Sequence, residues 1–135
     1  MTTTPKPLAL IVEDDPFQSE IFMQAIAQAG YEVFHIDNGN RAIAYLNEHS
    51  PWLVLLDLHL PEIDGAAILQ HIRRQPHLHR TRVILATADP RMAEMGRSAS
   101  DLVLIKPISF SQLRSLAQRM LPDESPDSDA TSPKE

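Results

Sequence analysis

Residues 52–57 read WLVLLD, an uninterrupted apolar run that ends in an aspartate. A run this short, without polar alternation, is typical of a strand buried on both faces of a parallel sheet. Similar runs occur at 8–12 (LALIV), 82–87 (RVILAT) and 102–105 (LVLI), and the alternating run 32–36 (EVFHI) is typical of a half-buried strand. We therefore expect five strands, with the third at 52–56.

Helical patterns separate these strands. Asp15-Pro16 has the form of a helix start, and apolar residues recur at helical spacing from there to Gly30, so we expect Phe17 and Phe22 in the core. Further helices are expected near 42–46, 64–72, 90–99 and 109–120, with Ser109 capping the last. Trp52 is also expected in the core.

Alternating strands and helices predict an α/β fold, a (βα)5 doubly wound parallel sheet of the flavodoxin-like kind. Because the helices must cover both faces, the strand order reverses once, and 2-1-3-4-5 is the common solution. A length of 135 residues suits a single domain. We assign 1–7 as a disordered leader, 8–121 as the domain, and the Pro-, Ser- and acid-rich 122–135 as a disordered acidic tail.

Composition excludes several classes of protein. There is no cysteine, which rules out disulfides and thiolate chemistry and suits a cytoplasmic protein. No segment has the length of a membrane span or the form of a signal peptide, so we expect no membrane partner. The formal charge of −6 argues against nucleic acid. We interpret the His- and Arg-rich stretch 71–82 as a solvated surface rather than a metal or nucleic-acid patch.

Polar residues follow four of the expected strands. Glu13 and Asp14 follow the first, Asp57 the third, Thr87 the fourth and Lys106 the fifth. In the expected strand order, the first and third strands are neighbours, and the carboxyl ends of parallel strands meet at one edge of the sheet. These five side chains should therefore lie around a single site.

The chemistry of this set points to phosphoryl transfer. Three carboxylates repel by roughly 4 kcal/mol for each pair about 4 Å apart at an effective dielectric of about 20. A hard divalent cation such as Mg²⁺ offsets that repulsion through oxygen ligands. Lys106 can approach a phosphoryl oxygen, Thr87 adds a hydroxyl donor, and Asp57 is a carboxylate nucleophile. A flavin or nucleotide phosphate would be repelled by the Glu-Asp-Asp loop after the first strand.

Four motifs carry a resemblance to a known family: IVEDDP (11–16), LLDLHLPEIDG (55–65), ATAD (86–89) and LIKP (104–107). Over about residues 8–121, the chain resembles the receiver domain of bacterial two-component response regulators, of the stand-alone, chemotaxis-regulator-like kind. The resemblance implies that a histidine kinase or a histidine phosphotransfer protein donates the phosphoryl group, and that an unknown downstream protein reads the change. It implies a phosphoacceptor signalling protein rather than an enzyme.

The resemblance also implies individual roles. Asp57 would be the phosphoacceptor, Thr87 the switch and Lys106 the phosphoryl-binding residue, with a cis peptide before the following proline. Mg²⁺ would be held by Glu13, Asp14, Asp57 and the backbone carbonyl of His59. His59 and Asp89 would tune the lifetime of the phosphoryl group, although ordinary loop polarity explains both equally well.

Two departures from the family pattern leave alternatives open. Val103 stands where the family has an aromatic residue, and only 19 positions separate Thr87 from Lys106, which predicts a shortened fourth helix. Both changes fall on the family's usual output surface, so a phosphorylation-independent adaptor is the second hypothesis. A phosphatase with an aspartate nucleophile is disfavoured, because His59 occupies the place where that class has a second aspartate.

Overall fold

The computed structural model describes residues 5–123, apart from the side chain of Met95. The first four residues of the expected leader, and residues 124–135 of the expected tail, lie outside this range. Within residues 5–123, no helix has both the length and the apolar character that crossing a bilayer requires.

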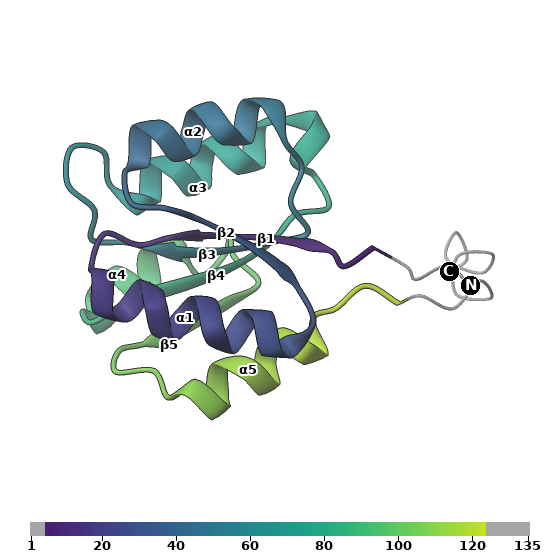
Figure 1. The fold of residues 1–135 in the computed structure, drawn as a ribbon. Helices are drawn as coiled ribbons and strands as arrows, with labels where there is room; N and C mark the ends of the chain where they lie inside the picture. Colours follow the sequence, from purple (N-terminus) through teal and green to yellow (C-terminus); the bar gives the residue numbers. More distant parts are fainter. Residues whose placement is uncertain (1–4, 124–135) are drawn as a thin grey trace.

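A five-stranded parallel sheet in the order β2-β1-β3-β4-β5 forms the centre of the molecule (Figure 1). This confirms the predicted flavodoxin-like topology. The third strand begins and ends one residue later than predicted, so Asp57 is its last residue. The strands are β1 (Leu8–Val12), β2 (Glu32–Ile36), β3 (Leu53–Asp57), β4 (Arg82–Thr87) and β5 (Leu102–Ile105).

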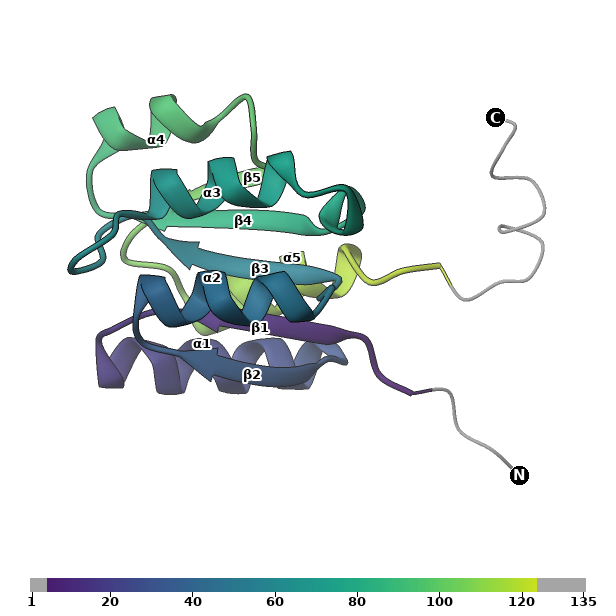
Figure 2. The same cartoon turned by 90° about the horizontal axis from the view of Figure 1, so that it is seen from above.

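Helices cover both faces of the sheet, as Figure 2 shows from above. On one face, α1 (Pro16–Ala29) packs beside α5 (Phe110–Arg119). On the other face lie α2 (Gly39–Glu48), α3 (Gly65–Arg74) and α4 (Pro90–Gly96), with a 3-10 turn, η1 (Pro76–Leu78), after α3. Each face buries its own apolar cluster against the sheet, because the strands project side chains alternately to the two sides.

Helix starts follow the predicted capping residues. The carboxylate of Asp15 accepts hydrogen bonds from the backbone N–H of Phe17 at 2.9 Å and of Gln18 at 3.4 Å. The hydroxyl of Ser109 accepts one from the N–H of Gln112 at 3.0 Å. Both caps satisfy helix N–H groups that have no partner within the helix. The directions of α1 and α5 are thus set at the edge of the sheet where β1 and β5 end.

Two expectations about the core need correction. Phe17 was expected to be buried, and its side chain is 82% exposed, whereas Phe22 is 3% exposed. The two residues are five positions apart, which places them about 140° apart around the helix, so they cannot share a face. Trp52 is half-buried against the edge of the core rather than enclosed within it. The fourth helix ends at Gly96, shorter than the expected 90–99, and this agrees with the predicted truncation.

Candidate functional site

The strand register brings the five predicted site residues to one edge of the sheet. Val12 of β1 is level with Leu56 of β3, so Glu13 and Asp14 follow β1 beside Asp57. On the other side, Asp57 is level with Ala86 of β4, one residue before Thr87. Thr87 is in turn level with Ile105 of β5, one residue before Lys106. Because β1, β3, β4 and β5 end level with one another, these five residues lie close together although they are far apart in the sequence.

Three carboxylates form the centre of this cluster. One oxygen from each of Glu13, Asp14 and Asp57 lies within 4.8 Å of the others. Glu13 is 2% exposed and Asp57 is 4% exposed, whereas Asp14 is open to solvent. In residues 5–123, this is the only group of three or more His, Asp or Glu side chains that could hold a metal ion. Oxygen donors with one face open to water fit Mg²⁺, which keeps part of its hydration shell.

Among the site carboxyl groups, Glu13 has the clearest pKa shift. Burial, and next the charge of Asp57, raise the pKa of Glu13 to about 7, while a hydrogen bond from the Asp15 N–H and the nearby Lys106 act in the opposite direction. The Asp15 N–H donates to Oε2 at 3.1 Å, and Lys106 Nζ donates to Oε1 at 3.2 Å. One ammonium group therefore does not offset the negative charge gathered here, and a divalent cation would complete the compensation.

Asp57 is held by contacts to both of its oxygens. Oδ1 accepts a hydrogen bond from the backbone N–H of His59 at 2.9 Å. Oδ2 lies 3.5 Å from Lys106 Nζ. The carboxylate is thus fixed in orientation, with Oδ2 on the side of the lysine. Any group that became bonded to Oδ2 would therefore lie next to the positive charge of Lys106.

Thr87 and Lys106 occupy the ends of β4 and β5. The hydroxyl oxygen of Thr87, which is fully buried, accepts a hydrogen bond from the N–H of Asp89 at 3.1 Å. The Thr87 side chain is therefore engaged by the loop that follows it. The peptide bond between Lys106 and Pro107 is cis, as expected from the motif.

His59 and Asp89, the two flanking positions, have local structural contacts. The side chain of Asp89 accepts a hydrogen bond from the N–H of Arg91 at 3.0 Å at the start of α4, and pairs with the Arg91 guanidinium at 3.4 Å. Hydrogen bonds from Arg91, first of its side chain and next of its backbone, lower the pKa of Asp89. A helix cap thus accounts for Asp89. His59 is exposed, and the metal-binding role of its carbonyl stays a prediction.

His35 on β2 is a site contact that the sequence analysis did not identify. Its Nε2 lies 2.7 Å from the backbone carbonyl oxygen of Glu13. The contact depends on the pairing of β2 with β1, in which His35 is level with Ile11. A histidine in an alternating edge strand carries no local signal of this role, and only the register reveals it.

Gly65 is a second residue whose role the sequence analysis did not identify, although it belongs to the LLDLHLPEIDG motif. Its position leaves no room for a side chain. A Cβ atom at this position would lie 2.5 Å from the carbonyl oxygen of Asp57 and 2.7 Å from Cα of Leu58. The N–H of Gly65 also bonds to the carbonyl oxygen of Leu58 at 3.2 Å. The start of α3 therefore packs directly on the backbone that carries Asp57.

An apolar surface borders the site. Phe17 and Ile21 of α1 are 82% and 45% exposed, although both are large hydrophobic residues. Between α1 and the loop after β5 is a hollow of about 480 Å³. Its lining residues are Gln18, Ile21, Phe22, Ala88, Lys106, Pro107 and Ile108. Lys106 thus belongs both to the acidic cluster and to this surface.

Comparisons with known proteins agree with this geometry. Residues 9–118 match the response regulator receiver domain family. The chain is 32% identical over 118 residues to the probable methanogenesis regulatory protein FilR2 of Methanothrix harundinacea, covering 79% of this chain and 76% of that protein. It is 31% identical over 103 residues to the polar-differentiation response regulator DivK of Brucella anthropi, covering 74% of this chain and 84% of that protein.

Solved structures give the same result. The signal receiver domain of a signal transduction histidine kinase from Syntrophus aciditrophicus superposes with a TM-score of 0.76 at 34% identity, covering 85% of this chain and 89% of that one. The receiver domain of the sensor histidine kinase PA1611 from Pseudomonas aeruginosa, solved with a magnesium ion in its active-site cleft, has a TM-score of 0.76 at 25% identity and covers 85% and 97%. The chain belongs to the response regulator receiver domain family, and this confirms the resemblance read from its four motifs.

Proposed function

We propose that this chain accepts a phosphoryl group on Asp57 from the phosphohistidine of a histidine kinase or a histidine phosphotransfer protein. The observation that carries the proposal is the convergence of Glu13, Asp14 and Asp57 within 4.8 Å, with Lys106 Nζ 3.5 Å from Asp57. Phosphoryl transfer depends mainly on positioning and charge compensation, and this site supplies both. We place the protein in the cytoplasm, where such donors present their phosphohistidine.

The first step is nucleophilic attack by an Asp57 oxygen on phosphorus. The P–O bond forms, the P–N bond to the donor imidazole breaks, and the imidazole leaves with the electron pair and takes a proton from solvent. Oδ2 suits this role because Oδ1 is occupied by the His59 N–H at 2.9 Å. Lys106 then stands beside the transferred group and compensates its charge.

The carboxylates of Glu13, Asp14 and Asp57 would hold Mg²⁺, and the carbonyl of His59 would complete the protein ligands. When bound, the ion neutralises charge that develops on the phosphoryl oxygens. The buried Glu13 needs this partner most, since its pKa is raised to about 7 in its absence. His35 holds the Glu13 backbone in place, through the contact at 2.7 Å.

Thr87 would convert phosphorylation into a change of shape. Its hydroxyl now accepts a hydrogen bond from the Asp89 N–H at 3.1 Å. A phosphoryl group on Asp57 would offer that hydroxyl a stronger, charged acceptor. Rotation of Thr87 toward it would release Asp89, which caps α4, so the loop before α4 is the element that responds.

The test is incubation with acetyl phosphate and Mg²⁺, followed by intact-mass analysis. We expect the wild-type chain to gain one phosphoryl group and Asp57→Asn to gain none. Asp37→Asn is the matched control, because Asp37 is an exposed carboxylate that forms a surface ion pair with Arg41. Labelling of Asp57→Asn equal to that of wild type would refute the proposal.

The apolar surface at Phe17 and Ile21 supports a docking place for the phosphodonor protein. The hollow of about 480 Å³ opens beside Lys106, so a partner seated there would deliver its phosphohistidine to Asp57. An exposed apolar patch of this kind is typical of protein contact sites. Phe17→Ala should slow transfer from a phosphorylated histidine kinase of the same organism, and should leave labelling by acetyl phosphate unchanged.

A phosphorylation-independent adaptor is the second candidate, and two observations favour it. Val103 lies in β5, partly buried, where family members carry an aromatic residue, and α4 has only seven residues. Both would weaken transmission from Thr87 to the α4–β5 surface. Equal affinity of a downstream partner for the unmodified chain and the acetyl phosphate-treated chain would establish this alternative. In either case, we propose a signalling protein with no other substrate to turn over.

A further inference from the structure

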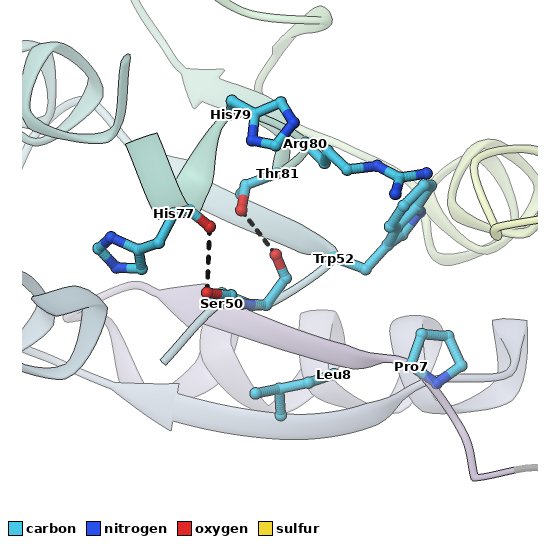
Figure 3. A pocket seen from close by; sticks show the side chains of 9 residues that line it. Pro7, Leu8, Ser50, Trp52, His77, His79, Arg80 and Thr81 are labelled. Carbon is cyan, nitrogen blue, oxygen red and sulfur yellow. Dashed lines mark hydrogen bonds between the residues drawn. The ribbon is translucent and has the colours of Figure 1, made fainter. Parts of the chain in front are cut away.

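Figure 3 shows a second hollow. It lies where strands of the sheet begin, whereas the carboxylate cluster lies where they end. It has a volume of about 370 Å³. It is formed where β1 and β3 begin and where η1 leads into β4, so no residue of the phosphoacceptor site takes part. Its lining residues are Pro7, Leu8, Ser50, Pro51, Trp52, His77, His79, Arg80 and Thr81.

Internal hydrogen bonds fix the walls of this hollow. The hydroxyl of Ser50 donates to the carbonyl oxygen of His77 at 3.1 Å, and that of Thr81 to the carbonyl oxygen of Pro51 at 2.7 Å (Figure 3). Trp52 Nε1 donates to the carbonyl oxygen of Met120 at 2.6 Å. These polar groups are satisfied within the protein, so the hollow has its shape before anything binds.

The groups left for a ligand are basic. Arg80 is exposed, and its guanidinium carbon lies 6.0 Å from the ring centre of Trp52. Within residues 5–123, no carboxylate is in ion-pair distance of the Arg80 guanidinium. One nitrogen of each histidine faces a backbone carbonyl, His77 toward Leu46 and His79 toward Pro76, which leaves the other nitrogen available. Among the described residues, none that lines the hollow is acidic. Its chemistry therefore suits carboxylates.

The C-terminal part of the same chain is rich in carboxylates and follows a residue that contacts this hollow. The bond from Trp52 to Met120 fixes the end of α5 against the wall of the hollow, and the described chain leaves the sheet at this end (Figures 1 and 2). Residues 124–135 (ESPDSDATSPKE) then carry four acidic side chains against one lysine, a formal charge of −3. Acidic residues flank Pro126, and proline packs well on aromatic rings such as Trp52.

We propose that residues 124–135 dock in this hollow, with Glu124 and Asp127 beside Arg80 and the two histidines, and with Pro126 on Trp52. Pro126 follows Met120 by six residues, and the carbonyl oxygen of Met120 lies 2.6 Å from Trp52 Nε1. Six residues span at most about 20 Å when extended, so the segment is tethered close to this wall. A short tether gives an effective concentration on the order of millimolar, so a weak intrinsic affinity suffices. The contact would mask a basic surface on the side of the domain away from Asp57.

Trp52 is the only tryptophan in the chain and reports directly on this hollow. We would compare amide and indole NMR spectra of the whole chain with those of a chain that ends at Asp123. We expect shifts of the Trp52 indole N–H and of the amides of 77–81, and loss of the difference in about 1 M salt, where the Debye length is about 3 Å. A synthetic peptide of residues 124–135 should reverse the shifts, with half-saturation on the order of 1 mM.

Two variants sharpen the test. Arg80→Gln should weaken binding of that peptide by about two- to fivefold, the range of a partly exposed ion pair. Arg41→Gln is the matched control, because Arg41 is an exposed arginine at the start of α2, at the other end of the sheet, and it should leave the affinity unchanged. A whole-chain variant with Glu124→Gln, Asp127→Asn and Asp129→Asn should have the Trp52 resonance of the shortened chain.

Three outcomes would overturn the proposal. Identical spectra of the whole and shortened chains would show that the segment does not dock. Shifts confined to α1 and the loop after β5 would place it on the other surface. Differences that grow with protein concentration would show docking between copies, or of a separate acidic partner, rather than within one chain.

Discussion

At the scale of single residues, Glu13 carries the largest consequence of the fold. This residue directly follows β1, and its carboxyl group is buried, faces Asp57, and has a pKa raised to about 7. The same residue in an unfolded chain has an ordinary pKa, 4.5. Two measurable pH effects follow, one on metal binding and one on stability.

Mg²⁺ affinity should fall as the pH drops below about 7, because the ion binds the ionised carboxylate and must displace the proton of Glu13. The loss should approach tenfold for each pH unit, the limit for displacement of one proton. Calorimetric Mg²⁺ titrations from about pH 5.5 to 8 measure it, with Glu20→Gln as a control for an exposed carboxylate on α1. An affinity that does not change across this range would contradict the prediction.

Without divalent ions, the contribution of Glu13 to stability should decrease as the pH rises, whereas its contribution to Mg²⁺ affinity increases. A folded-state pKa above the unfolded value means that the stabilising contribution is complete below about pH 4.5 and is lost as the pH rises through about 7. Glu13→Gln removes this loss, so its free energy of unfolding should rise relative to wild type with increasing pH, by on the order of 3 kcal/mol at most. Urea unfolding of both chains in EDTA, at a series of pH values, gives the difference.

At the scale of elements, the start of α3 and the end of β3 are in contact through backbone. Gly65→Ala would place a methyl group 2.5 Å from the Asp57 carbonyl oxygen, and neither backbone can rotate aside. We expect a loss of roughly 2–3 kcal/mol in unfolding free energy, as for overpacked interiors, and slower phosphorylation by acetyl phosphate. Gly96→Ala is the comparison, because its methyl group meets the end of the Leu85 side chain and should cost less.

The short α4–β5 connection depends on Asp101. Its carboxylate accepts from the Val83 N–H at 2.7 Å, from Arg82 Nε at 3.2 Å and from Arg73 Nη2 at 3.2 Å. The Arg73 side chain also donates to the carbonyl oxygens of Ala99 and Thr81. This network joins α3, β4 and the connection between α4 and β5.

Asp101→Ala should therefore destabilise the protein by about 1–3 kcal/mol, the range for leaving partly buried donors without an acceptor. Asp37→Ala removes an exposed pair with Arg41, and should change the stability by less than about 1 kcal/mol. Chemical unfolding of the two variants distinguishes the cases. Equal losses would mean that the Asp101 network contributes no more than a surface ion pair.

At the scale of the whole molecule, Tyr31 joins the two halves of the chain. It follows α1, is 1% exposed, and donates its hydroxyl proton to the carbonyl oxygen of Ala117 in α5 at 2.9 Å. Burial raises the pKa of Tyr31 to about 12. This hydrogen bond links the end of α1 to α5, between residues that are 86 positions apart in the sequence.

Tyr31→Phe should lower the unfolding free energy by about 1–2 kcal/mol near neutral pH, because the buried hydrogen bond from the Tyr31 hydroxyl to the Ala117 carbonyl oxygen is lost. Since the folded pKa lies above the ordinary 10.0, wild type should lose stability as the pH rises from about 10 through about 12, and the variant should lose less. Tyr45→Phe is the control on the other tyrosine, which stacks on Phe34 at the surface. A matching alkaline profile for wild type and Tyr31→Phe would exclude this role.

The sequence alone determined the strand order and the set of residues at the strand ends. Apolar runs such as LALIV and WLVLL define buried strands locally, and a polar residue directly after each run must lie at the carboxyl edge of a parallel sheet. Glu13, Asp14, Asp57, Thr87 and Lys106 could therefore be assigned to one site without coordinates. The capping residues Asp15 and Ser109 were equally readable, because capping is a local interaction.

Only the tertiary structure decided the features that depend on distant segments. The contact of His35 with Glu13 needs the register of β2 on β1, and the exposure of Phe17 depends on which face of α1 meets the sheet. The raised pKa of Glu13 requires burial and a neighbouring carboxylate from another strand. The basic hollow at Trp52 and Arg80 is formed by three separate segments. Each is a product of packing between residues far apart in the chain, for which local periodicity carries no signal.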